Sequence, residues 1–476
     1  MAKKPLVLDV DGTLLSTDML FESFWAGLGQ APLATLRACF THFTRPAKLK
    51  RALEEIVTLR TDLFPVNPAV REAAQAAQDA GREVVLASAS DRALVERIAA
   101  ENGFSERVFA SEPGRNLKGR AKAAALVEAF GEGGFDYAGN AAVDRAVWEK
   151  ADRALIVGDP ASERWAEARG QAYDALPGGS DLRGIIKALR PHQWVKNVLL
   201  FVPLLAGHVF APLPWLWTLL GMAAFSLAAS SIYVVNDLLD LEADRLHEKK
   251  RFRPFASGRV SIPIGMAVGF GAGAVALGLA AALSWGFFAV IAGYMALSLA
   301  YSLKLKRMRW IDITVLASLY TIRVLAGALA SGVGISVYLL TFIFPVFIAL
   351  GSVKRLTEVS LAKTDARLPG RGYGKPDRGD LLNVALIGMV GALVSFFAYS
   401  FTEQAMVLYP TRWLVWLTLV PIAWWLGRMI RLGYYGKQDY DPIVFALTDK
   451  RGIGILLIAL AMMFQAAKLW QGWFGM

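Results

Sequence analysis

The feature that most constrains this chain is a series of long apolar runs in its C-terminal part, residues 181–476. Each run approaches the ~20 residues that a helix needs to cross the hydrocarbon core of a bilayer. A backbone in lipid must satisfy its own hydrogen bonds, which favours helices for runs of this length. The sequence therefore predicts an all-α, polytopic membrane domain of about nine transmembrane helices, near residues 194–211, 213–235, 262–283, 285–303, 311–330, 335–351, 381–402, 411–430 and 453–473.

Lys and Arg are unevenly distributed among the loops of this domain. The loops after the second, fourth, sixth and eighth runs are rich in them, whereas the others, such as 331–337 and 402–411, carry almost none. By the positive-inside rule the basic loops are cytoplasmic. This predicts a protein of the cell (plasma or inner) membrane with its N-terminal domain in the cytoplasm and its C-terminus outside. The net charge of +11 then follows from membrane orientation, and we expect no nucleic-acid partner.

Residues 1–180 have the pattern of a separate α/β domain. Helical patterns alternate with four apolar runs that have the length of buried strands, at 6–10, 83–87, 135–138 and 154–157. Such alternation predicts a doubly wound (Rossmannoid) parallel sheet. Polar residues follow the runs, at the carboxyl ends of the strands, where sheets of this kind bind ligands.

The polar residues that follow these strands are of the types found in phosphate sites. Along the chain they are Asp9-Val10-Asp11-Gly12-Thr13, Ser88, Lys118 or Lys122 in an alanine-rich helix, and Gly139-Asn140 with Asp144 four residues later. Over about residues 5–160 this order resembles the haloacid dehalogenase (HAD) superfamily. The resemblance implies a HAD-like fold with a helical cap at about residues 16–80.

The resemblance also implies a role for each residue. Asp9 would be the nucleophile and Asp11 the general acid and base. Ser88 would hold the phosphate, and Lys122 would balance its charge, because a carboxylate can attack phosphorus only if cations offset the repulsion. Mg²⁺, or Mn²⁺ in its place, would be held by Asp9, Asp11 and Asn140.

Asn140 departs from the HAD pattern, which has an acidic metal ligand after the glycine. A neutral amide can still bind Mg²⁺, but it supplies less charge. Two interpretations therefore stay open for this domain: an active phosphatase, and a weakened or purely structural one.

Helical patterns between Phe21 and Leu63 carry several aromatic residues, namely Phe21, Phe24, Trp25, Phe40 and Phe43. We expect these side chains to form the core of the cap itself. The alternative is contact with the membrane surface or with the membrane domain.

An acidic segment follows the second apolar run, in a loop that topology favours as basic: Asn236-Asp237-Leu238-Leu239-Asp240-Leu241-Glu242-Ala243-Asp244. If the helix continues, Asn236 or Asp237, Asp240 and Asp244 share one face. Carboxylates so placed repel one another unless cations lie between them. Mg²⁺ binds carboxylates together with substrate phosphates, so the segment predicts a diphosphate site held through Mg²⁺. The alternative is a solvated helix end paired with basic residues, namely Arg245, Lys249 and Lys250.

This segment resembles the UbiA superfamily of intramembrane transferases over about residues 185–476. Most of its members are prenyltransferases with a second Asp-rich motif in a later cytoplasmic loop. The corresponding region here is Tyr301 to Asp312, and four residues after Asp312 stands Leu316 instead of an Asp. Arg323 follows within the fifth apolar run.

Three further segments resemble one branch of that superfamily, the polyprenyl-phosphate phosphoribosyltransferases. They are Arg190-Pro191-His192-Gln193-Trp194-Val195-Lys196-Asn197, Lys250-Arg251-Phe252-Arg253-Pro254, and Lys354-Arg355-x-x-Glu358. The resemblance implies phosphoribosyl pyrophosphate (PRPP) as donor and a polyprenyl phosphate as acceptor.

Three anionic groups must then be clamped: the diphosphate, the ribose 5-phosphate and the lipid phosphate. The candidates for this substrate-binding role are Lys196, Asn236, Lys304, Asp312, Arg323, Lys354, Arg355, Arg371 and Tyr373, together with Tyr301. An arginine inside an apolar run, such as Arg323, is by default a functional hypothesis, and its alternative is an ion pair between packed helices. The alternative for the lysines is interfacial snorkelling. Tyrosines are common at membrane interfaces, and His192 is expected to be interfacial.

The fusion of the two domains suggests sequential steps. Transfer of phosphoribose to a lipid phosphate leaves a 5-phosphate that a HAD-like domain could remove, with Mg²⁺ in both domains. A homo-oligomer is compatible with this function. Two competing functions are a prenyltransferase with a structural or regulatory HAD-like domain, and a transporter or channel.

Overall fold

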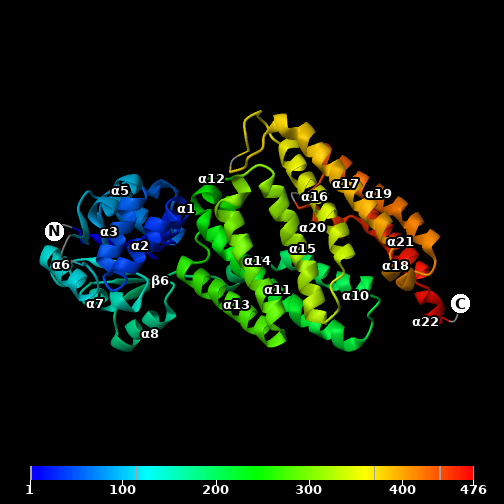
Figure 1. Ribbon diagram of the computed structural model, residues 1–476. Coiled ribbons are helices and arrows are strands. Elements are labelled where there is room, and N and C mark those ends of the chain that lie inside the picture. The colour runs from blue at the N-terminus through cyan, green and yellow to red at the C-terminus, as the bar shows by residue number, and fades with distance from the viewer. Residues whose placement is uncertain (1–2, 113–115, 369, 439–440, 475–476) are drawn as a thin grey trace. The chain divides into compact units, whose positions relative to one another are not determined.

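The computed structural model describes residues 3–112, 116–368, 370–438 and 441–474. Backbone contacts divide the chain into two compact units, which are coloured by residue number in Figure 1. The first contains residues 1–189 and 233–271, and the second contains residues 190–232 and 272–476. The division passes through helices α11 (Pro212–Leu239) and α13 (Ile262–Leu283). The acidic segment at the end of α11 is therefore part of the first unit.

The first unit is built on a six-stranded parallel sheet with the strand order β3-β2-β1-β4-β5-β6. Its strands are β1 Leu6–Asp9, β2 Val84–Asp91, β3 Val108–Ser111, β4 Asp136–Gly139, β5 Ala154–Val157 and β6 Tyr173–Leu176. Successive residues of β1 face opposite sides, so Leu6 and Leu8 enter one apolar core and Val7 the other. The predicted doubly wound sheet is confirmed. The short strand β3 and the half-exposed edge strand β6 were not predicted, because neither has a long apolar run.

Helices cover both faces of this sheet. They are α4 Pro68–Asp79, α5 Arg92–Asn102, α6 Arg120–Phe130, α7 Arg145–Trp148 and α8 Pro160–Arg169. Helix α9 Leu182–Ala188 follows β6 and packs with residues at the end of α11 instead. Three more helices lie between β1 and β2 in the chain: α1 Met19–Gln30, α2 Pro32–His42 and α3 Pro46–Ile56. Asp18 caps α1 by accepting a hydrogen bond from the amide of Leu20 (2.9 Å), and prolines begin α2 and α3.

The aromatic residues of these three helices do not form a core of their own, so that expectation is wrong. Trp25, with Phe21 and Phe24, packs on apolar residues at the end of α11 and after it, namely Val234, Leu238, Leu241 and Phe255. Phe40 and Phe43 are 91% and 83% exposed. The cap helix α1 therefore contacts the segment that carries the acidic motif, within the first unit.

The second unit is all helical. Its elements are η3 Pro191–Phe201, α10 Val202–Ala206, most of α11 and part of α13, α14 Trp285–Leu303, α15 Ile311–Ser331, α16 Val337–Ser360, α17 Arg378–Tyr399, α18 Glu403–Leu408, α19 Arg412–Tyr434, α20 Pro442–Thr448, α21 Lys450–Ala466 and α22 Leu469–Phe474. Short elements in the loops are α12 Leu241–Leu246 and η4 Lys250–Phe252, both in the first unit, and η5 Leu305–Arg307 and η6 Lys375–Asp377.

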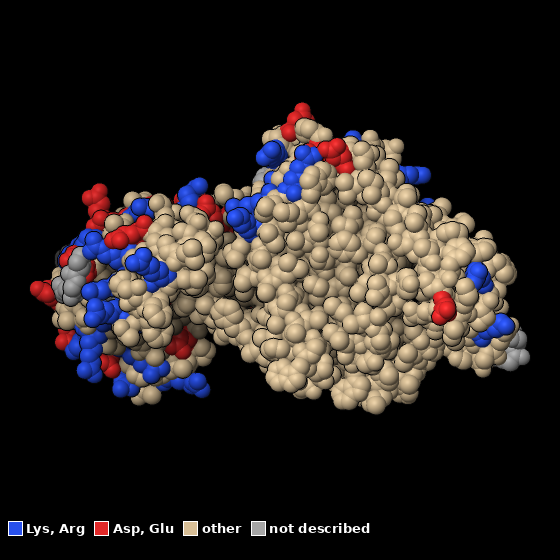
Figure 2. Space-filling model, viewed as in Figure 1, with Lys and Arg blue, Asp and Glu red and all other residues tan. Residues whose placement is uncertain are grey.

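Seven helices in the described ranges are long and apolar enough to cross a membrane: α11, α13, α14, α15, α16, α17 and α19. Figure 2 shows that the visible surface over the long helices is almost bare of charged side chains, as expected for contact with lipid. The predicted count of nine is not confirmed. Residues 194–211 form the 3₁₀ segment η3 followed by the short helix α10, and α21 has 17 residues. The chain is thus an integral membrane protein with an all-α C-terminal part.

Candidate functional site

Asp9, the predicted nucleophile, lies at the end of β1. Asp9 is 9% exposed, and its Oδ1 lies 2.6 Å from Nζ of Lys122 on α6. Lys122 also donates to the hydroxyl of Tyr137 (2.9 Å). Burial alone would lower the pKa of Lys122, but the carboxylates of Asp9 and Asp144 outweigh it and raise that pKa. The structure thus holds a charged lysine against Asp9, while Lys118 is exposed.

The turn after β4 is organised by Asp144. Its Oδ2 accepts hydrogen bonds from the amides of Asn140 and Ala141 (both 3.2 Å), and its Oδ1 accepts one from Tyr137 (3.1 Å). Asn140 is thereby placed beside Thr13, whose hydroxyl donates to Asn140 Oδ1 (3.1 Å). Gly12, at φ +75°, leaves room for the Asn140 amide, because a Cβ at Gly12 would lie 2.3 Å from its Nδ2.

Asp11 is fixed at the same edge of the sheet. Its Oδ1 accepts from the amide of Met19 (2.8 Å) and its Oδ2 from the hydroxyl of Ser90 (2.9 Å). Buried Ser88 accepts from the Ser90 amide (3.1 Å). Burial, with the carboxylate of Asp18, raises the pKa of Asp11 to about 6. A carboxyl group with that pKa can donate and accept a proton near neutral pH.

The acidic segment forms a second cluster in the first unit. The helix is interrupted at Asp240, which lies at φ −104° between α11 and α12. The 4-residue hydrogen-bond spacing is kept, because the Asp240 amide donates to Asn236 O (3.1 Å) and its carbonyl accepts from the Asp244 amide (2.8 Å). Asp237 Oδ1 and Asp244 Oδ2 converge on one atom, Nη1 of Arg253, at 3.0 and 2.7 Å. Burial raises the pKa of Asp244 to about 6, against the effect of Arg253. Two nearly buried carboxylates therefore share one cation.

Asn236 adds a polar atom to this cluster. Its Oδ1 is buried and has no hydrogen-bond partner among the described residues. A buried acceptor left unsatisfied in a protein costs free energy and is a reason to expect a ligand.

A buried ion pair connects the acidic segment to the HAD-like fold within the first unit. Arg245 on α12 donates from Nη2 to Glu22 Oε1 (2.5 Å) and from Nη1 to Oε2 (3.1 Å), and Glu22 belongs to α1. Both side chains are at most 6% exposed. Arg245 entered only the alternative interpretation of the segment, as a basic partner of its acidic residues, and its observed partner is instead Glu22. The two-point contact positions α12, and with it Asp244, against the cap.

Both acidic clusters contain oxygen atoms that could act as metal ligands. Across the described residues, no group of three or more His, Cys, Asp or Glu side chains is arranged to hold a metal ion. Mg²⁺ does not need three, because it is commonly held by one or two carboxylates plus phosphate oxygens and water. Asp237 and Asp244 already converge on a cation, and Asp9, Asp11 and Asn140 supply oxygen donors at one sheet edge. Both donor sets suit Mg²⁺ or Mn²⁺.

In the second unit, Asp312 lies in a buried ion network. Arg355 is fully buried and binds Asp312 through Nε and Nη2, the latter at 2.9 Å from Oδ1, and Glu358 through Nη1 at 2.6 and 2.7 Å. Tyr301 donates to Asp312 (2.8 Å), and Arg371 lies 3.8 Å from Asp312 at 24% exposure. Asp312 and Arg355 satisfy each other, so Arg371 is the accessible cation of this cluster.

Three other residues considered in the sequence make no direct contact with Asp312: Tyr373, which binds the loop before it, and Lys304 and His192, which are exposed. Tyr373 is buried, and its hydroxyl accepts from the amide of Trp310 (2.7 Å), a residue held at the unusual φ of +67° two positions before Asp312. Lys304 is an exposed residue at the end of α14, and His192 is exposed.

Arg323 is enclosed by aromatic and polar groups of the second unit. Its Nε donates to Asn197 Oδ1 (3.0 Å), its Nη2 to the Tyr294 hydroxyl (3.2 Å), and its Nη1 to the carbonyl of Leu319 (2.6 Å). Its guanidinium lies over the rings of Phe225, Tyr294 and Tyr320. These contacts hold η3, α14 and α15 together around one buried charge.

Lys196 and Lys354 meet at a residue that the sequence interpretation missed. Lys196 on η3 forms an ion pair with Asp441, and Nζ of Lys354 on α16 lies 4.0 Å from the same Oδ2. Tyr320 donates to that oxygen at 3.5 Å. Asp441 precedes α20 and caps it by accepting from the amides of Ile443 and Val444.

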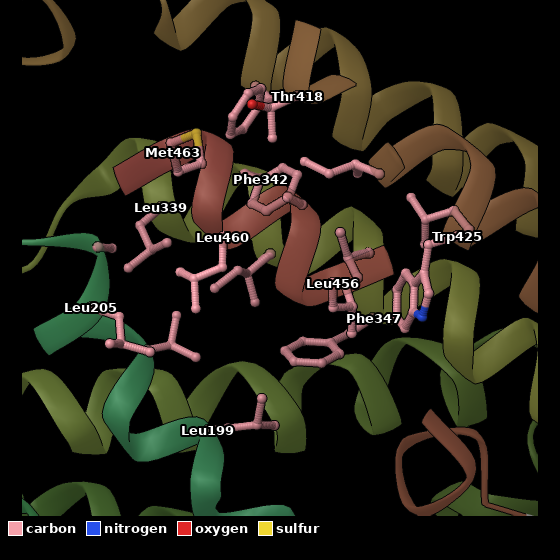
Figure 3. Close-up of a pocket in the computed structure, with 18 of the residues that line it drawn as sticks. Leu199, Leu205, Leu339, Phe342, Phe347, Thr418, Trp425, Leu456, Leu460 and Met463 are labelled. Carbon is pink, nitrogen blue, oxygen red and sulfur yellow. The ribbon is translucent and has the colours of Figure 1, made fainter. Parts of the chain in front are cut away.

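An apolar cavity of about 450 Å³ lies in the second unit. Figure 3 shows side chains from η3, α10, α16, α19 and α21 pointing into it, among them Leu199, Phe347, Trp425 and Leu460. Its walls are almost entirely hydrocarbon and aromatic, so it is suited to an apolar chain.

Comparison with known proteins agrees with this architecture. The chain matches the UbiA prenyltransferase family over residues 198–447 and the haloacid dehalogenase-like hydrolases over residues 6–147. It is 35% identical to the uncharacterized protein y4nM of Sinorhizobium fredii, over 97% of this chain and 91% of that protein. It is 36% identical to the nodulation protein NoeC of Azorhizobium caulinodans, over 58% of this chain and 92% of that protein.

A third relative matches only part of the chain. The decaprenyl-phosphate phosphoribosyltransferase of Corynebacterium glutamicum is 40% identical over 39% of this chain and 58% of that protein. The chain belongs to the UbiA prenyltransferase family: it is an integral membrane transferase that carries a haloacid dehalogenase-like hydrolase domain at its N-terminus.

Proposed function

We propose that the chain transfers 5-phosphoribose from PRPP to a polyprenyl phosphate, and that its HAD-like domain then removes the 5-phosphate. The product is a polyprenyl-phosphoryl-ribose. The relative from Corynebacterium glutamicum supports this substrate pair, because it is named for a phosphoribosyl transfer to a lipid phosphate.

The observation that carries the proposal is the pairing of one cationic cluster, Lys196 and Lys354 around Asp441, with an apolar cavity in the second unit. Lys196 and Lys354 share one carboxylate, and Arg371 is partly exposed beside a satisfied ion pair. Lys196 and Lys354 exceed Asp441 by one positive charge, which favours an anionic ligand, and a cavity of about 450 Å³ with hydrocarbon walls favours an apolar chain. A lipid phosphate and a sugar phosphate together meet both requirements.

In the transfer step a phosphate oxygen of the lipid attacks C1 of the ribose, and the bond from C1 to the diphosphate breaks. Asp237, Asp240 and Asp244 would hold Mg²⁺ with the donor diphosphate, and the metal would supply charge neutralisation for the leaving group. Arg253 and Asn236 Oδ1 would contact the donor. The lipid phosphate is already a nucleophile, so no strong base is needed.

In the second step the Asp9 carboxylate attacks the 5-phosphate, and the ribose 5-oxygen leaves with a proton from Asp11. Water then cleaves the aspartyl phosphate and returns the proton to Asp11. Lys122 balances the charge of the bound phosphate, with Ser88 as a hydrogen-bond donor. Asn140 supplies the amide oxygen of a metal site that Mg²⁺ or Mn²⁺ would occupy.

The basic loops favour a location in the cell membrane with the HAD-like domain in the cytoplasm and the C-terminus outside. Reporter fusions to each terminus test this orientation. A reporter that functions only in the cytoplasm should be inactive when it is fused to the C-terminus. Activity of that fusion would contradict the orientation.

A prenyl diphosphate is the competing donor, since the family as a whole is named for prenyl transfer. Asp312 argues against it, because it is held by Arg355 instead of standing in a second acidic array. Incubation with labelled PRPP or labelled prenyl diphosphate separates the two. We expect incorporation into lipid from PRPP alone, and none with Asp237→Asn.

A further inference from the structure

Three elements of the second unit converge on the carboxylate of Asp441. Lys196 comes from η3, Lys354 from α16 and Tyr320 from α15, and all three face the same oxygen, Oδ2. The Lys196 and Lys354 side chains are 9% and 20% exposed, and that of Asp441 is 16% exposed. Two ammonium groups thus share one carboxylate in a largely enclosed place, which leaves an excess of one positive charge among these three groups.

The same elements continue into the apolar cavity. Leu199, three residues after Lys196, lines it, and so does Leu350, one helical turn before Lys354. Ile443, two residues after Asp441, lines it as well. The cationic cluster therefore lies at one boundary of the cavity, where the walls change from charged to hydrocarbon. A ligand that fits both parts has an anionic head and an apolar chain.

We propose that Lys196 and Lys354 bind the phosphate of the lipid acceptor, that the cavity holds the first part of its hydrocarbon chain, and that Asp441 is an internal counterion which this phosphate displaces. The inference rests on the proposed function for the identity of the lipid. It adds the place of the acceptor and a residue that competes with it.

The role of Asp441 follows from what the lysines require. Two lysines this deeply enclosed are costly without an anion, so Asp441 stabilises the site before the lipid binds. A phosphate dianion can pair with both ammonium groups and accept a hydrogen bond from Tyr320. The single Oδ2 of Asp441 meets the same three groups less well, because Lys354 lies 4.0 Å and Tyr320 3.5 Å from it. Asp441 keeps its Oδ1 contacts to α20 throughout, so it needs to move only one oxygen.

Direct binding to the full-length protein in detergent tests the proposal. The probes are a radiolabelled polyprenyl phosphate, the matching polyprenol without phosphate, and inorganic phosphate. Asp441→Asn removes the competing charge and keeps the cap of α20, because Asn is also a good N-cap residue. We expect polyprenyl phosphate to bind about three- to tenfold more tightly to Asp441→Asn, because the lipid phosphate no longer has to displace the Asp441 carboxylate from the two lysines.

The lysine variants should act in the opposite direction. Lys196→Gln and Lys354→Gln should each weaken polyprenyl phosphate binding by about tenfold, the equivalent of one charge-assisted hydrogen bond. Polyprenol binding should be unchanged in all three variants, and inorganic phosphate alone should bind far more weakly than the lipid. Lys437→Gln is the matched control, because Lys437 is exposed and lies four residues from Asp441. It should change nothing.

Two results would overturn the proposal. One is a loss of lipid phosphate binding in Asp441→Asn comparable to that in the lysine variants, with unfolding temperatures unchanged. The other is equal binding of polyprenol and polyprenyl phosphate. If Asp441→Asn unfolds, Asp441→Ser, which also caps a helix, takes its place in the same comparison.

The assay contains no PRPP, so its outcome is separate from that of the proposed function. Tight, lysine-dependent binding of lipid phosphate without PRPP turnover would contradict the proposed function and leave this site in place. If PRPP is turned over but substitutions at Lys196, Lys354 and Asp441 leave the KM for the lipid unchanged, the proposed function would stand and this acceptor site would be contradicted.

Discussion

The two acidic clusters of the first unit differ in the cation that balances them. Asp9 is paired with Lys122, which is 4% exposed, lies within α6 and is also held by Tyr137. Asp237 and Asp244 are paired with Arg253, which is 29% exposed and follows the short element η4. The first cation is a fixed part of the fold. The second lies where a metal ion with a diphosphate could replace it.

The largest expected effect tests the fixed cluster. Asp9→Asn removes the proposed nucleophile, so phosphomonoester hydrolysis should fall on the order of 10³-fold or more. The transfer reaction should continue, and the lipid product should keep its 5-phosphate. Phosphate release and the mass of the lipid product measure the two steps. Unchanged phosphate release would assign hydrolysis to other residues.

The next effect tests the acidic segment. Asp237→Asn removes one charge from the pair that shares Arg253, and transfer should fall by about 10²–10³-fold. Hydrolysis of a small phosphomonoester by the same preparation should stay at the wild-type rate, which serves as the folding control. Equal loss of both activities would show that the two clusters are not independent.

The contrast between the fixed cation, Lys122, and the replaceable one, Arg253, can be measured through the free energy of unfolding. Lys122→Met leaves Asp9 and Asp144 buried without their cation, and the unfolding free energy should fall by about 3–5 kcal/mol. Mg²⁺ at millimolar concentration should restore only a small part of it.

Arg253→Gln is the matched variant. It should cost about 1–3 kcal/mol without Mg²⁺, and added Mg²⁺ should recover most of that loss, because ligand binding to the folded state stabilises it. Thermal unfolding of both proteins with and without Mg²⁺ provides the comparison. Equal recovery in the two variants would remove the distinction between the clusters.

The smallest effect concerns Asn140. Asn140→Asp keeps the shape of the side chain beside Gly12 and restores an acidic donor. The Mg²⁺ concentration for half-maximal hydrolysis should fall by about tenfold, the equivalent of ~1.4 kcal/mol, with little change in the maximal rate. A large rise in the maximal rate would instead support the interpretation of the natural domain as weakened.

The HAD-like cluster could be predicted because Asp9, Asp11, Ser88 and Asn140 lie at or just after the ends of predicted strands, and parallel strands bring those ends together; Lys122, on α6, was predicted from the resemblance. Asp9, Asp11, Ser88, Lys122 and Asn140 do meet at one edge of the sheet. The helical register of the acidic segment was likewise predictable from its spacing. The count of membrane helices was less predictable, because one apolar run forms a 3₁₀ segment followed by a five-residue helix and another yields only 17 helical residues.

Residues whose contacts are far away in the chain could not be predicted, because no local sequence pattern indicates their partners. Asp441 is 245 positions from Lys196, and no spacing in the sequence connects them. Arg253 was part of a recognised basic motif, but its placement between Asp237 and Asp244 depends on how the chain folds back after α12. Lys304, predicted from charge alone, is exposed. Charge in a sequence identifies candidate cations, and packing decides which of them are brought together.

The most direct test of the central claim uses PRPP labelled separately in the ribose ring and in the 5-phosphate, with a polyprenyl phosphate and the full-length protein. The account predicts that ribose label enters the lipid fraction and that the 5-phosphate label is released as phosphate. Asp9→Asn should retain both labels in the lipid, and Asp237→Asn should incorporate neither. Absence of ribose label from the lipid, with prenyl diphosphate consumed under the same conditions, would contradict it.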